Sequence, residues 1–206
     1  TEMKSTLPKL AHEGDGIIFA SGDFTKRDVF NLTFDLSKID QPITALRLEA
    51  LPDDRLPKKG PGRAFYEGRA GTFFLSELSA VVKGKALEFA TGSQSYGKNG
   101  LGKDKVGPKD VFDGEGSTGW STAGGEGKPH ELVLNLKEPL EGSGMLAVEL
   151  LFELHFVSAL GKFRISATTR TGEVAATTSP EFNPTSATVA EAKRQYLRVA
   201  TEFAAA

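Results

Sequence analysis

Apolar and polar residues alternate along most of this chain, in short segments separated by glycine and proline. Between residues 145 and 154, apolar side chains fill every second position, and Glu149 and Glu153 lie between them. Successive side chains of a β-strand point to opposite faces, so this pattern predicts a strand with one buried face. Strand-like patterns also occur in residues 16–20, 29–36, 44–51, 72–82, 86–91, 131–136 and 162–168.

These segments give about eight strands with glycine- or proline-marked connections, which is typical of an all-β sandwich or jelly roll. No helical pattern alternates with the strands, and this argues against a parallel α/β sheet. We therefore predict a single jelly-roll β-sandwich domain over residues 1–183, made of two antiparallel sheets.

The pattern changes after Asn183 and Pro184. Thr188 and Glu191 fit a helix capping box, and apolar residues follow at helical spacing. We expect residues 184–206 to form a C-terminal helix that packs on the sandwich, or a tether to a following domain.

Two connections are too long for hairpin turns, namely residues 51–71 and 92–128. The first is rich in proline and glycine, and the second in glycine, serine, lysine and aspartate. Long loops in a compact domain are usually functional or disordered, so we expect a binding site there.

Composition narrows the classes of function. The 25 basic and 27 acidic residues nearly balance, and this argues against nucleic acid as a partner. The absence of cysteine excludes disulfides, thiolate metal sites and covalent haem attachment in this domain. No apolar run has the length of a membrane helix, and residues 1–10 lack the layout of a signal peptide.

Motifs that would indicate catalysis are incomplete. Residues 97–103 match most of a phosphate-binding loop, but Asp104 stands where the motif needs Ser or Thr. Residues 119–123 approach a nucleophile elbow but lack its final glycine. The histidines are scattered, and the sequence selects no catalytic pair among the strand carboxylates. We expect a protein that is not an enzyme, and a hydrolase or lyase is the least favoured alternative.

Residues 113–120 contain the most informative polar motif. Asp113, Ser117 and Thr118 supply the oxygen atoms that calcium prefers, and Asp113 followed by Gly114 also forms an ordinary turn. Both interpretations stay open. Trp120, the only tryptophan, would either stack on a sugar ring or cap the core.

The sequence also resembles a known family. Residues 43–53, 56–63, 71–78, 113–120, 127–130 and 160–169 resemble the β-sandwich module of planctomycete multidomain proteins that also carry c-type cytochrome domains. Residues 113–120 are similar to a signature of galactose-binding, discoidin-like domains. The resemblance implies an exported jelly roll that binds carbohydrate, often with structural calcium, and that adjoins other domains of a larger protein.

We therefore expect a non-catalytic carbohydrate-binding module, monomeric as an isolated domain, that targets a larger exported protein to polysaccharide. Sugar recognition needs an aromatic face and planar polar groups. The loop residues of these types are Arg63, Tyr66, Tyr96, Asn99, Trp120 and His130. The alternative is a structural spacer or docking domain within a redox multidomain protein, in which Arg63, Trp120 and His130 stabilise the loops.

Overall fold

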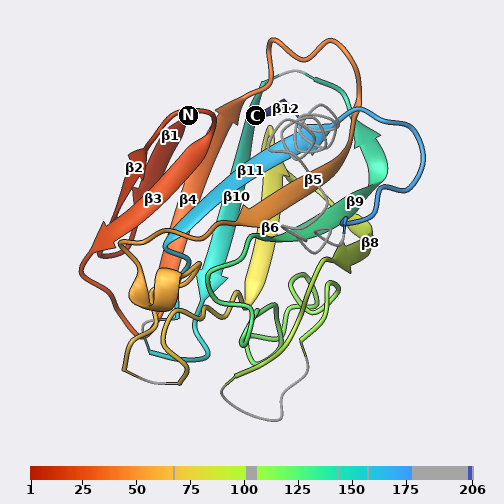
Figure 1. Ribbon diagram of the computed structural model, residues 1–206. Coiled ribbons are helices and arrows are strands. Elements are labelled where there is room, and N and C mark those ends of the chain that lie inside the picture. The colour runs from red at the N-terminus through yellow and green to blue at the C-terminus, as the bar shows by residue number, and fades with distance from the viewer. Residues whose placement is uncertain (67, 101–105, 143, 157, 178–203, 206) are drawn as a thin grey trace, which may run out of the picture.

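The computed structural model describes residues 1–66, 68–100, 106–142, 144–156, 158–177 and 204–205. Two antiparallel β-sheets lie face to face (Figure 1). The strands, in chain order, are β1 (Glu2–Ser5), β2 (Pro8–His12), β3 (Ile17–Gly22), β4 (Asp28–Asp35), β5 (Ile43–Ala50), β6 (Glu77–Val82), β7 (Lys85–Ala86), β8 (Phe89–Gln94), β9 (His130–Leu140), β10 (Met145–Phe152), β11 (Lys162–Thr168) and β12 (Ala204–Ala205). A short 3-10 helix, η1 (Pro57–Lys59), follows β5.

The smaller sheet has the order β1-β4-β10-β6-β7, and the larger has the order β2-β3-β11-β5-β9-β8, with β12 beside β11. The inward residues of each strand form the core, as the alternation predicts. Phe30 of β4 connects the two layers, because its ring centroid lies 5.0 Å from that of Phe152 and 5.8 Å from that of Phe163. All three side chains are buried.

Strand register places the connections at the two ends of the sandwich. Phe152 pairs with Asp28, and Ala50 pairs with both His130 and Phe163, so these strand ends lie at the same end. The connections after β3, β5, β8 and β10 therefore share one end, called the loop end below (lower part of Figure 1). Both long connections, residues 51–76 and 95–129, belong to it.

The two antiparallel sheets confirm the predicted all-β sandwich, whereas the jelly-roll arrangement stays a prediction, and the strand list differs in detail. The sequence prediction missed β1 and β2, which are short edge strands with mostly exposed or half-buried residues. It treated residues 86–91 as one strand, whereas β7 and β8 belong to different sheets. Residues 184–203, where a helix is expected, lie outside the described residues. Within the described part of the chain, no helix is long and apolar enough to cross a membrane.

Candidate functional site

The two long connections meet at the loop end. Leu75 and Trp120 exchange backbone hydrogen bonds of 2.9 and 2.8 Å, and the Gly127 N–H donates to the Gly60 carbonyl at 2.8 Å. Arg69 Nε also donates to Glu126 Oε2 at 2.7 Å. Contacts in three places join residues far apart in the sequence, so the two loops form one continuous surface.

An open cleft of about 460 Å³ lies between the loops and is lined by Lys58, Arg69, Ala70 and Glu126. Sequence reasoning selected none of these residues, because nothing in a loop of mixed polarity marks the side chains that face a neighbouring loop. The one usable signal was Glu126, a charged residue flanked on both sides by glycines.

Trp120 belongs to the core of the loop end. Its side chain is 0% exposed, its ring meets Phe73 edge to face at 5.0 Å, and Nε1 donates to the Tyr96 carbonyl at 2.9 Å. A ring in this position has no face open to a sugar. The role that the structure gives Trp120 is to hold the second loop on the sandwich.

Tyr96 and His130 pack together below the surface. Their ring centroids are 5.3 Å apart, and the Tyr96 hydroxyl donates to the Ala123 carbonyl at 3.0 Å. Nε2 of His130 donates to the Gly125 carbonyl at 2.8 Å. Burial lowers the pKa of His130 below its ordinary value, so the ring is neutral at pH 7. Both polar tips are therefore engaged with the backbone of the loop.

Arg63 is also buried and holds a turn. Its guanidinium donates to the carbonyl oxygens of Gly22 and Asp23, which join β3 to β4. Burial lowers the pKa of Arg63, and the charges of Asp28 and Asp23 work in the opposite direction. Asn99, in the second long loop, is half-buried. The guanidinium of Arg63 is thus engaged within the protein, and ligand binding by Arg63 and Asn99 stays a prediction.

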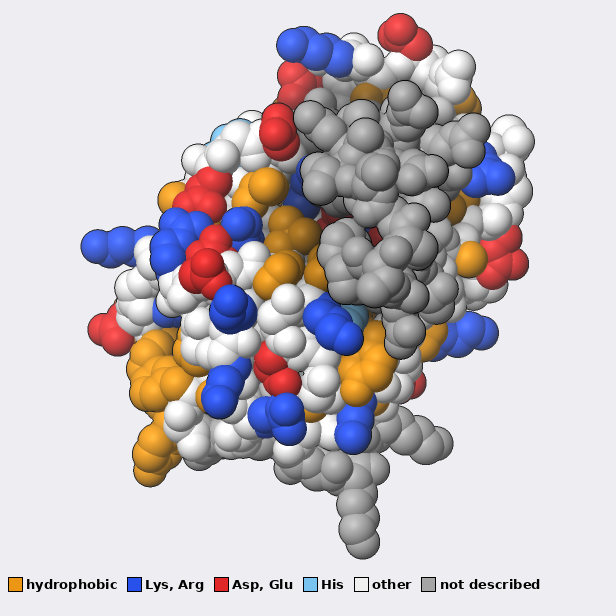
Figure 2. All heavy atoms as spheres, in the orientation of Figure 1, with side chains coloured by type: hydrophobic (Ala, Val, Ile, Leu, Met, Phe, Trp, Pro, Cys, Tyr) orange, Lys and Arg blue, Asp and Glu red, His pale blue; other side chains and the backbone are white. Residues whose placement is uncertain are grey.

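Tyr66 is the candidate that the structure leaves accessible, with 75% of its side chain exposed. Its neighbour Phe65 is 56% exposed and packs edge to face on Phe24, at 5.4 Å between ring centroids. Phe24 also packs on Phe156 at 5.4 Å. Hydrophobic side chains accordingly project from the lower left of Figure 2, over the loop that follows η1. We call Phe24, Phe65, Tyr66 and Phe156 the aromatic tip.

The residues expected to hold calcium form a polar turn. The Thr118 hydroxyl donates to Asp113 Oδ2 at 2.8 Å, and the Glu115 N–H donates to Asp113 Oδ1 at 2.9 Å. Ser117 is exposed. Within the described ranges, no group of three or more His, Cys, Asp or Glu side chains is arranged to hold a metal ion. Asp113, Ser117 and Thr118 offer one carboxylate and two hydroxyl oxygens, so these residues fit a calcium shell only in part, and calcium stays a prediction.

Glu77, at the start of β6, lies against this turn. Burial, together with the charge and hydrogen bonding of Asp113, raises the pKa of Glu77 to about 7. Its Oε1 atom is buried and has no hydrogen-bond partner in the described structure. Two adjacent carboxyl groups favour a shared proton or a bound cation between them. The sequence did not single out this pair, because Glu77 and Asp113 are 36 positions apart in the chain.

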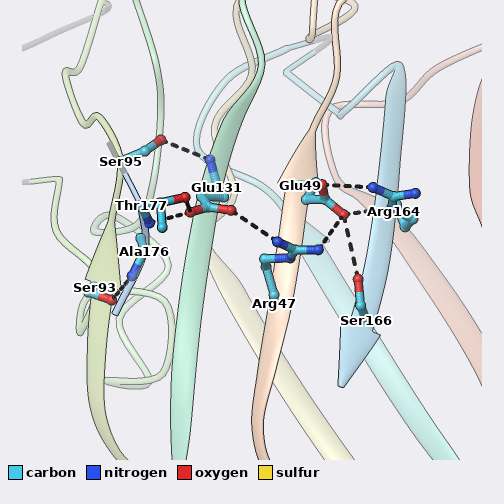
Figure 3. Close-up of polar contacts among 9 residues, drawn as sticks. All are labelled: Arg47, Glu49, Ser93, Ser95, Glu131, Arg164, Ser166, Ala176 and Thr177. Carbon is cyan, nitrogen blue, oxygen red and sulfur yellow. Dashed lines mark hydrogen bonds and ion pairs between the residues drawn. The ribbon is translucent and has the colours of Figure 1, made fainter. Parts of the chain in front are cut away.

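The outer face of the larger sheet is the other surface that could receive a ligand. A row of charged side chains crosses β11, β5 and β9 (Figure 3). Arg164 forms a two-point ion pair with Glu49, at 2.6 and 2.9 Å, and Arg47 lies 3.4 Å from both Glu49 and Glu131. The side chain of Arg47 is 3% exposed. The row is therefore a nearly buried ionic network.

Residues 170–177, called the strap, lie against this face. Glu131 accepts hydrogen bonds from the backbone N–H and the hydroxyl of Thr177 (Figure 3). Asn135 pairs with both the N–H and the carbonyl of Val174, each at 2.9 Å. Val174 is buried on Ala45 and Val133. The strap thus occupies part of the sheet face, which leaves the loop end as the better candidate for ligand binding.

No family model matches this sequence, and no curated protein or solved structure is similar to it at a significant level.

Proposed function

We propose that this chain is a non-catalytic carbohydrate-binding module that binds polysaccharide at the loop end. The observation that carries the proposal is the cleft between the two long loops, together with exposed Tyr66 three residues before Arg69. Sugars are recognised by an aromatic face and a few fixed polar groups. Tyr66 offers the face, and Arg69 and Lys58, which line the cleft, offer the polar groups.

We further propose that the sandwich is a jelly roll of the galactose-binding type. The support is the nested pairing of β3 with β11, β4 with β10 and β5 with β9, in alternate sheets. The resemblance in residues 43–53, 113–120 and 160–169 supports an exported module of a planctomycete multidomain protein with c-type cytochrome domains. The neighbouring domains of that protein are then partners of this module, in addition to polysaccharide.

A spacer or docking domain is the second candidate. Trp120 and Arg63 support it, because both are buried in contacts that hold the loop end together. The aromatic tip would then meet a neighbouring domain. A hydrolase gains some support from the raised pKa of Glu77, since glycosidases keep a protonated carboxylic acid. However, Glu77 Oε1 is buried. Retaining and inverting glycosidases also need two carboxyl groups about 5 to 9.5 Å apart, whereas Glu77 and Asp113 are within hydrogen-bonding distance of each other.

The test is affinity electrophoresis of the domain through gels containing soluble polysaccharides. A retarded wild type and a clearly less retarded Tyr66→Ala variant are the expected result, because stacking on one ring contributes about 0.5 to 1.5 kcal/mol. Met145→Ala is the matched control, since Met145 is 49% exposed and lies at the opposite end of the sandwich. Equal retardation of both variants would contradict the site. A domain retarded by no polysaccharide would favour the spacer.

A further inference from the structure

We propose that the cleft at the loop end selects acidic polysaccharides and binds their carboxylate or sulfate groups through Arg69 and Lys58. The inference rests on the proposed carbohydrate-binding function and adds the chemical class of the ligand. It is carried by the way in which Glu126 holds Arg69 and by the charges around the cleft.

One nitrogen of the Arg69 guanidinium is held by a hydrogen bond, and the rest of the group is accessible. Its Nε donates to Glu126 Oε2 at 2.7 Å, yet the side chain remains 60% exposed. The terminal guanidinium nitrogens have no acceptor among the described residues. Arginine presents its N–H groups in a rigid planar fork that matches the oxygens of a carboxylate or sulfate. An anchored Nε therefore orients the open edge of the fork before a ligand arrives.

Glu126 serves as the anchor and is itself fixed. Its side chain is 9% exposed, and its Oε1 accepts the Gly124 N–H at 2.8 Å. Burial alone would raise the pKa of Glu126, but the hydrogen bonds from Gly124 and Arg69 lower it below the ordinary value. The carboxylate is thus charged at pH 7, and both oxygens are committed to holding the loop and the arginine. Glu126 has little capacity left to repel an acidic ligand.

Lysines surround this arginine. Lys58 lines the cleft, and Lys59 lies beside Gly127. Both lysines and Lys128 are exposed. Lys59 pairs with Asp54 at 3.2 Å, whereas Lys58 and Lys128 form no ion pair within the described structure. Figure 2 shows several blue groups over the loop end, with few red ones between them. Among the described residues of this region, Lys58, Lys59, Arg69 and Lys128 outnumber Asp54 and Glu126, although the whole chain carries a formal charge of −2.

A glycan fits these features better than a nucleic acid does. Binding along a phosphate backbone takes a long basic stripe on a basic protein. Here the positive charge is confined to one cleft of a nearly neutral chain, and the exposed ring of Tyr66 belongs to the same loop. Occasional acidic groups along a sugar chain match one anchored arginine and one or two lysines.

The experiment compares one polysaccharide in three forms: neutral dextran, carboxymethyl dextran, which carries carboxylates, and dextran sulfate. Oligodeoxythymidine is the nucleic-acid probe. We expect binding of one or both charged dextrans, and the pair separates carboxylate from sulfate recognition. Arg69→Gln and Lys58→Gln should each weaken that binding about tenfold, which corresponds to about 1.4 kcal/mol. Lys85→Gln, the same change of charge on β7 at the opposite end, should leave it unchanged.

The Glu126→Gln variant distinguishes two explanations of binding, namely orientation of Arg69 by Glu126 and non-specific attraction by net positive charge. The substitution removes a negative charge, so non-specific attraction predicts tighter binding of the charged dextrans. Loss of the anchor predicts weaker binding, and this is the result we expect, with a cooperative thermal transition and an unchanged circular dichroism spectrum as the check on folding. Tighter binding by Glu126→Gln, equal loss in Lys85→Gln, or equally tight oligodeoxythymidine binding would overturn the inference.

The proposed function can fail separately from this inference. A domain that binds neutral polysaccharide through Tyr66 and is indifferent to Arg69→Gln would overturn acidic selectivity alone. A domain that binds no polysaccharide, charged or neutral, would overturn both proposals.

Discussion

Glu77 and Asp113 bring two carboxyl groups together at the start of β6, and burial with this contact raises the pKa of Glu77 to about 7. The unfolded chain binds the same proton with a pKa near 4.5. Between these values the folded state binds more protons than the unfolded state, so the contribution of Glu77 to stability falls as pH rises from about 4.5 to 7.

Glu77→Gln should remove this dependence. A glutamine has the same shape and carries no titrating proton, so the variant should gain stability relative to wild type as the pH is raised from 5 to 8. Urea unfolding of both proteins at a series of pH values measures the difference. Parallel curves for the two proteins would mean that the Glu77 carboxyl titrates as an ordinary surface group.

Calcium binding at the Asp113 turn would depend on the same proton. An ion that prefers the folded state raises the melting temperature by mass action, and it competes with the proton for the Glu77 carboxyl. We expect calcium to raise the melting temperature more at pH 8 than at pH 5.5, and Asp113→Asn to abolish the increase. Melting that is identical in calcium and in chelator would leave Asp113 as a turn residue only.

Trp120 gives a fluorescence test of the binding site, since it is the only tryptophan and is fully buried. Its emission should lie at short wavelength, resist quenching by acrylamide, and stay constant when a polysaccharide binds. A spectral shift on binding would instead place the sugar against the indole ring, as the sequence alone allowed.

Asn135 should control the strap. Asn135→Leu keeps a similar volume but removes the hydrogen bonds to the N–H and the carbonyl of Val174, a residue only 4% exposed. Leaving such groups unpaired costs about 1 to 3 kcal/mol, so we expect a comparable loss of stability and faster proteolysis within residues 170–177. Thr91→Val removes the hydrogen bonds of the Thr91 hydroxyl to Asn135 and to exposed Glu173 of the strap but leaves both bonds to Val174, so it should loosen the strap less than Asn135→Leu does. Equal proteolysis of the Leu variant and wild type would show that other contacts hold the strap.

Leu150→Ala tests the core. Leu150 is fully buried on β10, and truncation leaves a cavity that costs about 2 to 5 kcal/mol. Met145→Ala on the same strand should cost less than about 0.5 kcal/mol, because Met145 is exposed. Denaturant unfolding measures both, and similar losses would mean that the buried face of β10 is wrongly assigned.

The sequence predicts the sandwich well because the core strands bury one face, and burial of one face imposes alternation. β4, β5, β10 and β11 all follow the predicted segments within a residue or two. Edge strands bury little, so β1 and β2 leave no such pattern. Residues 86–91 are divided between two sheets because the chain turns from the smaller sheet into the larger one after β7. The alternation of apolar and polar residues does not reveal such a turn.

The candidate site was harder to predict, because residue type alone does not tell whether a loop side chain faces solvent or core. Trp120 and Arg63 are chemically suited to binding sugar, but their size and hydrogen-bonding capacity are used to pack and tie the loop end. Arg69 and Glu126 are 57 residues apart, and only the folded chain brings them together.

The two sheets are joined at both of their outer edges, since the chain passes from β1 to β2 on one side and from β7 to β8 on the other. Long, flat edge strands are templates for pairing with other molecules, and they promote aggregation. Here the edge strands are short, with four residues in β1 and two in β7, and each is interrupted where the chain turns into the other sheet. Short, interrupted edges offer a neighbouring molecule few unpaired backbone groups, so we expect concentrated solutions of the domain to resist edge-to-edge strand pairing.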